Sequence, residues 1–199
     1  MSIKNSIKDF KKKFIEYDQI ANFTDIGRRV FANNSFDGIL TIIGILLGAY
    51  YSGINDAMTI VKTGLGASIA MGVSGAWGAY YTEKAERRKE IIELERAILK
   101  PMKNTKIEKA ATFATIFITI LDGLSPFLSS FIVIIPFFFI KNTNLIYAYI
   151  SAICIAFLLL GLLGVFLGKI SKENIYRVAL RMMVAGVVCI LLTLFLQVL

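Results

Sequence analysis

The stretch LIYAYISAICIAFLLLGLLGVFL, residues 145–167, contains no charged residue. A helix that crosses a bilayer needs about 20 mainly apolar residues, so this stretch alone is long enough to span a membrane. Four further apolar stretches accompany it, at residues 36–51, 58–81, 110–140 and 176–199. The sequence therefore predicts an all-α membrane protein whose residues 35–199 form a bundle of five transmembrane helices.

The composition agrees with a membrane protein and excludes several classes of function. The chain is 56% hydrophobic with a mean hydropathy of +0.68, whereas soluble domains are roughly 45–50% apolar. It has no histidine, which excludes histidine-based catalysis, metal ligation and proton relay. Cys154 and Cys189 each lie deep in an apolar stretch, so we expect no disulfide framework and no cysteine zinc site. With no nucleophile–base pair and no phosphate-binding glycine loop, we do not expect an enzyme.

The net charge of +8 is distributed unevenly over the connections between the apolar stretches. Residues 1–34 contain seven Lys or Arg, residues 82–109 contain nine, and residues 169–177 contain three, whereas the short connections near Gly53 and Lys141 contain one between them. Lys and Arg mark the cytoplasmic side of a membrane. We therefore expect a multi-pass protein, in the cell membrane, with a cytoplasmic N-terminus, an external C-terminus and lipid rather than nucleic acid as partner.

The cytoplasmic segment 1–34 carries an amphipathic pattern. Its apolar residues recur at helical spacing: Ile3, Ile7, Phe10, Phe14 and Tyr17. Such a helix, with lysines around its apolar face, can lie on an anionic membrane surface. It can equally pack against the rest of the protein, and both interpretations stay open. Because these residues are charged and contain no apolar core segment, we expect no signal peptide.

The second apolar stretch predicts a helix that continues beyond the membrane. Several glycines and serines between Gly64 and Gly78 predict close packing inside the bundle. No Gly or Pro interrupts residues 82–100, which predicts an acidic cytoplasmic helix. Four glutamates share one face of it at spacings of three, four and three: Glu83, Glu86, Glu90 and Glu93. Paired carboxylates one turn apart can share a metal ion, but Arg87 and Lys89 can also neutralise them as a solvated, salt-bridged face.

Two aspartates lie within the predicted spans, each followed by glycine. Asp37 begins the first span and Asp122 interrupts the third. A carboxylate in a bilayer costs several kcal/mol unless it is paired, hydrated or bound to a cation, so both are candidate metal ligands. Pro126 cannot donate a hydrogen bond to the carbonyl of Asp122, which adds an oxygen suited to divalent cations. The structural alternative pairs these aspartates with Arg181 or Lys62.

Four segments, in order along residues 25–199, resemble the vacuolar iron transporter family. They are RRVFANNSFDGILTIIGILLGAY at 28–50, SGAWGAYYTEKAER at 74–87, DGLSPFLSSFIVIIPFFF at 122–139 and YRVALRMMVAGVVCILLTLFLQVL at 176–199. The resemblance implies a homodimeric exporter of Fe(II) or Mn(II) that exchanges the ion for protons. It needs no cofactor other than the transported ion. It further implies an ion path between the two first spans, with Asp37 as a ligand, and metal capture by the glutamates at 83, 86, 90 and 93.

Two departures from the family pattern leave a second interpretation open. Ala79 and Gly75 stand where the family has a glutamate and a methionine, and the connection between the second and third spans is short. Asp122 can replace the missing ligands, which is our own hypothesis and does not come from the resemblance. Alternatively, the chain is a membrane scaffold or assembly protein that keeps the fold without transporting an ion.

Overall fold

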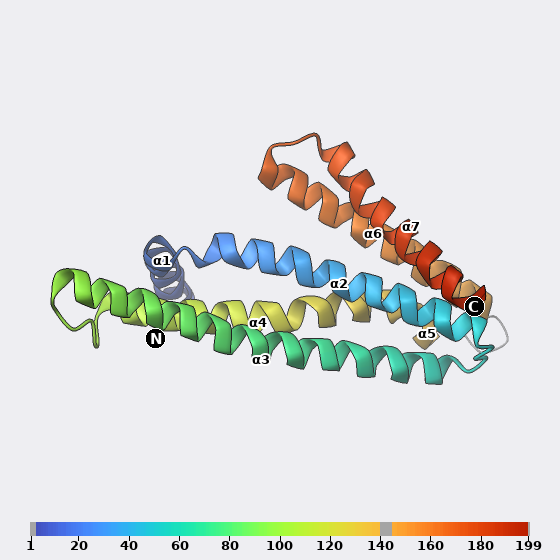
Figure 1. The fold of residues 1–199 in the computed structure, drawn as a ribbon, viewed down its shortest axis with the longest axis horizontal. Coiled ribbons are helices and arrows are strands. Elements are labelled where there is room, and N and C mark those ends of the chain that lie inside the picture. The colour runs from blue at the N-terminus through green and yellow to red at the C-terminus, as the bar shows by residue number, and fades with distance from the viewer. Residues whose placement is uncertain (1–2, 140–144, 199) are drawn as a thin grey trace. The chain divides into compact units, whose positions relative to one another are not determined.

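The computed structural model describes residues 3–139 and 145–198, and all regular secondary structure in these residues is helical (Figure 1). The helices are α1 (Ile3–Ala21), α2 (Phe23–Tyr51), α3 (Ala57–Ile98), α4 (Lys106–Ile134), α5 (Pro136–Phe139), α6 (Leu145–Ser171) and α7 (Ile175–Val198). The predicted connection at Lys141 and the last residue of the predicted fifth span lie outside the described residues.

Five of these helices are long and apolar enough to cross a membrane, namely α2, α3, α4, α6 and α7. In each, fewer than half of the residues in the apolar stretch are buried inside the chain. Apolar surface that the chain leaves uncovered is suited to contact with lipid. The all-helical fold and the five helices thus fit the predicted multi-pass membrane protein.

Two helix bounds differ from those expected. Helix α2 begins at Phe23, well before residue 36, because nothing in residues 23–35 breaks a helix. The predicted span 110–140 is not one helix, since α4 ends at Ile134 and α5 begins at Pro136. Proline lacks an N–H donor and disfavours the helical conformation in the residue before it, which explains the break at Ile135. Pro126, in contrast, lies inside α4.

The chain folds as two compact units, the first of which comprises residues 1–31 and 74–123. It contains α1 with the beginning of α2, the second part of α3 and the first part of α4. Phe14 and Tyr17 of α1 pack onto a core that includes Phe23 and Ala114, and the rings of Phe14 and Phe23 meet edge to face at 5.0 Å. Of the apolar residues predicted to share one face of this helix, Phe14 and Tyr17 thus pack against protein. The side chains of residues 3 and 7 are outside the described set.

Phe10, at the other end of the described stripe, remains 60% exposed although its ring lies 6.4 Å from that of Phe113. Between α1 and α2 the chain turns at Asn22, whose φ is 45°. The carboxylate of Asp18 accepts a hydrogen bond from the backbone N–H of Thr24 at 2.8 Å, which caps the new helix. Phe14 and Tyr17 of α1 are thus packed, whereas Phe10 stays accessible.

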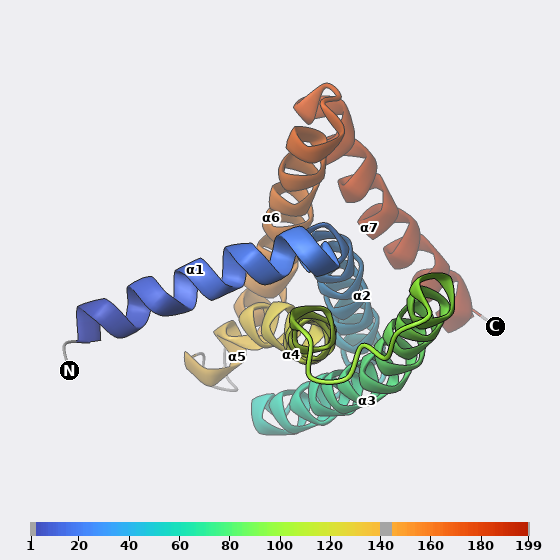
Figure 2. The same ribbon diagram turned by 90° about the vertical axis from the view of Figure 1, so that its left-hand side faces the viewer.

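The second unit comprises residues 32–73 and 124–199 and holds the larger core. The core side chains of α2 lie on one side of the helix and include Ile39, Ile42 and Leu46, each almost fully buried. Helices α6 and α7 form an antiparallel hairpin (Figures 1 and 2). Their backbones approach so closely that a Cβ on Gly164 would lie 2.3 Å from the Cα of Ala179. Only glycine fits at this contact.

The small residues of α3 are packed on one side only. Gly64 lies against Ile134, where a Cβ would come within 2.6 Å of Ile134 Cδ1. Gly66 and Gly78 have no atom within 4 Å of such a Cβ. The expected close packing of the second span is thus seen at Gly64 but not at Gly66 or Gly78 within one chain.

Candidate functional site

The Asp37–Gly38 pair has two roles on opposite sides of α2. Gly38 is buried against α4, where a Cβ would lie 2.5 Å from Ser129 Oγ and 2.6 Å from the carbonyl oxygen of Pro126. The hydroxyl of Ser130 donates a hydrogen bond to the Gly38 carbonyl at 3.1 Å. Gly38 is thus a packing residue, while Asp37 lies on the exposed side of the helix.

Asp37 begins an open face of α2, which we define by Asp37, Thr41, Gly44 and Gly48. These positions follow one another at spacings of four, three and four, so they share one side of the helix. Asp37 and Thr41 are exposed, and no atom lies within 4 Å of a Cβ at Gly44 or Gly48. The open face therefore offers a carboxylate, a hydroxyl and a flat, small-residue surface on a helix that is otherwise packed.

Asp122, in the first unit, lies against α3. A Cβ built on Gly75 would be 2.6 Å from Asp122 Oδ1 and 3.1 Å from its carbonyl oxygen. The half-buried carboxylate thus fills the space that a side chain at residue 75 would take. The Asp122 carboxylate of α4 and the missing side chain at residue 75 of α3 thus meet at one place. Asp37 belongs to the other unit.

The predicted partners of the two aspartates have other surroundings. Arg181 forms an ion pair with Glu173 at 3.3 Å, and both side chains are largely exposed. Lys62 is exposed on α3. Arg181 is thus paired with Glu173, and an ion pair of either aspartate with Arg181 or Lys62 stays a prediction.

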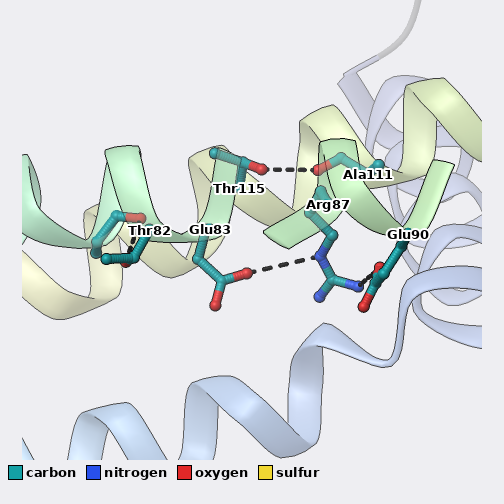
Figure 3. Close-up of polar contacts among 7 residues, drawn as sticks. Thr82, Glu83, Arg87, Glu90, Ala111 and Thr115 are labelled. Atoms are coloured by element: carbon teal, nitrogen blue, oxygen red, sulfur yellow. Dashed lines mark hydrogen bonds and ion pairs between the residues drawn. The ribbon is translucent and has the colours of Figure 1, made fainter. Parts of the chain in front are cut away.

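The four glutamates of α3 are engaged to different extents. Arg87 is only 8% exposed and lies between Glu83 and Glu90, with Nε 3.6 Å from Glu83 Oε2 and Nη1 3.2 Å from Glu90 Oε2 (Figure 3). Glu86 Oε1 is 3.9 Å from Lys89 Nζ. Glu93 is exposed. The salt-bridged interpretation thus describes Glu83 and Glu90 well, and the more accessible carboxylates are Glu86 and Glu93.

The surroundings of Glu83 shift the pKa of its carboxyl group. It lies beyond the apolar part of α3 with 19% of its side chain exposed. Burial raises the pKa of Glu83 above its ordinary value; Arg87 opposes this shift, and the charges of Glu90 and Glu86 reinforce it. As the pH falls, Glu83 therefore takes up a proton at a higher pH than an ordinary glutamate.

The predicted metal ligands belong to both compact units: Asp37 lies in the second, and Asp122 and the four glutamates lie in the first. Among residues 3–139 and 145–198, no three Asp, Glu, Cys or His side chains gather closely enough to hold a metal ion. Of the two cysteines, Cys154 is exposed and Cys189 lies 3.6 Å from the carbonyl oxygen of Leu40.

Sequence reasoning missed two features of these sites. It assigned Arg87 to a solvated face, although Arg87 is buried beside Ile91 and Ala111 in the space between α3 and α4. The apolar residues at Ile91 and Leu94, one and two turns further along α3, were the available signal that this side faces protein. The contact of Gly75 with Asp122 joins residues far apart in the sequence, and no local pattern indicates it.

Comparison with known proteins gives a relative of unknown activity. The chain is 37% identical over 172 residues to the uncharacterized protein MJ0645 of Methanocaldococcus jannaschii, covering 85% of this chain and 87% of the relative. No protein-family model matches the chain, and no solved structure matches it. Identity of this level over nearly the full length of both proteins shows common descent. The chain therefore belongs to the same protein family as MJ0645.

Proposed function

We propose that the protein is a homodimeric transporter that exports divalent metal ions, Fe(II) or Mn(II), from the cytosol. The observation that supports this most directly is the open face of α2. An exposed aspartate within a helix long and apolar enough to cross a membrane is costly in lipid, and Gly44 and Gly48 leave a flat surface beside it. Two such faces, related by a two-fold axis, would bring two Asp37 carboxylates together around a cation.

In this arrangement the carboxylates act in sequence. The glutamates of α3, led by the accessible Glu86 and Glu93, raise the local concentration of metal at the cytoplasmic mouth. Asp37 then binds the ion within the membrane, and Asp122, in the space beside Gly75, supplies a ligand in place of the side chains that Ala79 and Gly75 lack. With no histidine in the chain, any exchanged proton also travels on carboxylates.

The orientation follows from the charges of the connections. Seven Lys or Arg in residues 1–34 and nine in residues 82–109 support a cytoplasmic N-terminus and an external C-terminus in the cell membrane. The acidic helix of α3 then faces the cytosol, on the side from which an exporter takes its ion.

A second candidate function is a membrane scaffold or assembly protein without transport. The lack of a converged three-ligand group within the described part of one chain favours it. The cost of an uncompensated Asp37 on a membrane-spanning face speaks against it.

The two candidates differ in a flux measurement. Purified protein in proteoliposomes is offered Fe(II), Mn(II), Co(II), Zn(II) and Ca(II) in turn, with protein-free liposomes as the control. A transporter moves Fe(II) or Mn(II) well above the control and Ca(II) less. Flux of every ion at the control rate would contradict transport and favour the scaffold.

A further inference from the structure

A groove of about 450 Å³ lies between α3 and α4 in the first unit. Its lining along α3 extends from Tyr80 to Glu95, which at 1.5 Å per residue is a length of about 22 Å. The lining combines basic side chains of α3 with apolar and hydroxyl side chains of α4, including Thr112 and Ile116. Its length and mixed chemistry suit an elongated amphiphile better than a compact ion.

Three basic residues, Lys84, Arg87 and Arg88, line the groove within little more than one helical turn. Lys84 and Arg88 are exposed, and they are four residues apart on one side of α3. Helical side chains lean toward the N-terminus of their helix, so both lean toward the Tyr80 end of the groove. Positive charge is thus concentrated at that end.

The two acidic residues that line the groove form hydrogen bonds at the end opposite its basic residues. Glu95 accepts a hydrogen bond from the backbone N–H of Met102 at 2.6 Å, and Glu108 accepts one from the backbone N–H of Asn104 at 2.5 Å. Both carboxylates therefore hold the connection between α3 and α4, at the end of the groove opposite Tyr80. At the basic end, Arg87 is paired with Glu83 and Glu90, whereas Lys84 and Arg88 are exposed and can meet an anion.

Arg87, which also lines the groove, carries a buried donor. Its Nη1 contacts Glu90, and its Nε lies 3.6 Å from Glu83, beyond hydrogen-bond length (Figure 3). Within residues 3–139 and 145–198, its Nη2 has no hydrogen-bond partner, although the side chain is more than nine-tenths buried. A buried guanidinium N–H without an acceptor is unfavourable, and a phosphate oxygen would satisfy it.

The basic end of the groove lies where a membrane surface is expected. Trp77, Tyr80 and Tyr81 are exposed on α3 just before it, and exposed Trp and Tyr mark the level of the lipid headgroups. On α4, Ile116 and Ile120, one turn apart, stay about half exposed. An acyl chain could follow these two side chains while its headgroup reached the basic residues.

We propose that this groove binds one anionic phospholipid, with its phosphate held by Lys84, Arg87 and Arg88 and an acyl chain passing Ile116. A water-soluble phosphate would use the same donors, but it would leave the apolar path along α4 uncovered. The proposal does not depend on metal transport.

Lipid binding to the purified full chain in neutral detergent tests it. Phosphatidylglycerol is titrated against phosphatidylcholine with the same acyl chains and against glycerol phosphate, and bound lipid is counted by native mass spectrometry. We expect phosphatidylglycerol to bind at least about tenfold more tightly than the other two. Each basic residue near an anionic headgroup adds about a factor of five, so Lys84→Gln with Arg88→Gln should weaken this binding about thirtyfold.

Lys89→Gln with Lys103→Gln is the matched control, because it removes the same charge from exposed residues outside the groove. It should retain the wild-type preference. Equal binding of the two lipids, or an equal loss in the control variant, would overturn the proposal and indicate only general surface attraction. Glycerol phosphate binding as tightly as phosphatidylglycerol would overturn the lipid as occupant and assign the groove to a soluble anion.

Discussion

Gly38 and Gly75 show how single residues position the candidate carboxylates. Gly38 lets α2 approach α4 closely enough for Ser130 to donate to its carbonyl, and Asp37 is thereby presented on the other side of the helix. Gly75 leaves the space in which the Asp122 carboxylate lies. In both cases a glycine allows close packing next to a candidate carboxylate.

The pair of Gly75 and Asp122 should be strongly coupled in stability. Gly75→Met places a side chain where Asp122 Oδ1 now lies, and overpacking of this kind costs about 1–3 kcal/mol. Asp122→Ala in the same protein removes the contact with the carboxylate but leaves the backbone carbonyl oxygen at 3.1 Å, so the double variant should regain part of the loss. Thermal unfolding of the four proteins in detergent measures this coupling. Strictly additive changes in the unfolding midpoint would contradict the observed contact.

At the scale of elements, α3 is one long helix with two different parts. Residues 57–73 pack in the second unit through Gly64, whereas residues 74–98 belong to the first unit and carry the glutamates and Arg87. The acidic part and the apolar part are thus consecutive segments of one helix. In the proposed transporter, ion capture would fall to the first of these parts and membrane crossing to the second.

The four glutamates of α3 should contribute unequally to metal capture. Because Arg87 neutralises Glu83 and Glu90, alanine at Glu86 and Glu93 should raise the half-saturation concentration for metal flux several-fold, and alanine at Glu83 and Glu90 less. Maximal flux should stay near that of the wild type in both. The half-saturation concentrations of the two double variants are measured in proteoliposomes and compared. A larger increase on replacing Glu83 and Glu90 than on replacing Glu86 and Glu93 would contradict this prediction.

The pH dependence of metal flux provides a second test of metal capture by the α3 glutamates. The pKa of Glu83 is raised by burial, so its charge is present above that pKa and is lost as the pH falls through it, before ordinary glutamates are protonated. The half-saturation concentration for metal flux should therefore rise as cytoplasmic pH falls toward the acidic range. The part of this rise that occurs at the highest pH should be absent in Glu83→Gln.

Much of the fold could be predicted from the sequence, but the sites only in part. The five apolar helices follow from the length that a membrane requires, and the long α3 follows from the absence of Gly and Pro in residues 82–100. The early start of α2 and the break before Pro136 were missed because the apolar stretches mark only where lipid can contact a helix, not where the helix begins or ends. The burial of Arg87 was missed although Ile91 and Leu94 mark the same side of α3 as facing protein, because a local pattern does not show which element covers that side.

At the scale of the whole molecule, orientation in the membrane is the first matter to test. In a background with Cys154 and Cys189 replaced by alanine, single cysteines are placed at Ile54, between α2 and α3, and at Glu90. An impermeant thiol reagent added outside intact cells should label residue 54 and leave residue 90 unlabelled until the membrane is opened. The reverse pattern would contradict a cytoplasmic N-terminus.

Assembly is the second matter at this scale. If two copies meet through the open face of α2, Gly48→Cys in the same cysteine-free background should form a cross-linked dimer under mild oxidation. Gly66→Cys is the matched control, since Gly66 is equally uncovered but lies on α3. A protein that stays monomeric in gentle detergent, or that cross-links equally at both positions, would contradict the proposed interface.

The central claim is that Asp37 binds the transported ion within the membrane, and metal flux through Asp37→Asn tests it most directly. Loss of a charged ligand from a dehydrated ion costs several kcal/mol, so flux should fall about a hundredfold or more at every metal concentration while the protein remains folded. Asp25→Asn is the control, because Asp25 is an exposed aspartate of the same helix that pairs with Arg28 at 2.7 Å; it should transport normally. Normal flux through Asp37→Asn would contradict the intramembrane site and leave the non-transporting scaffold as the better account.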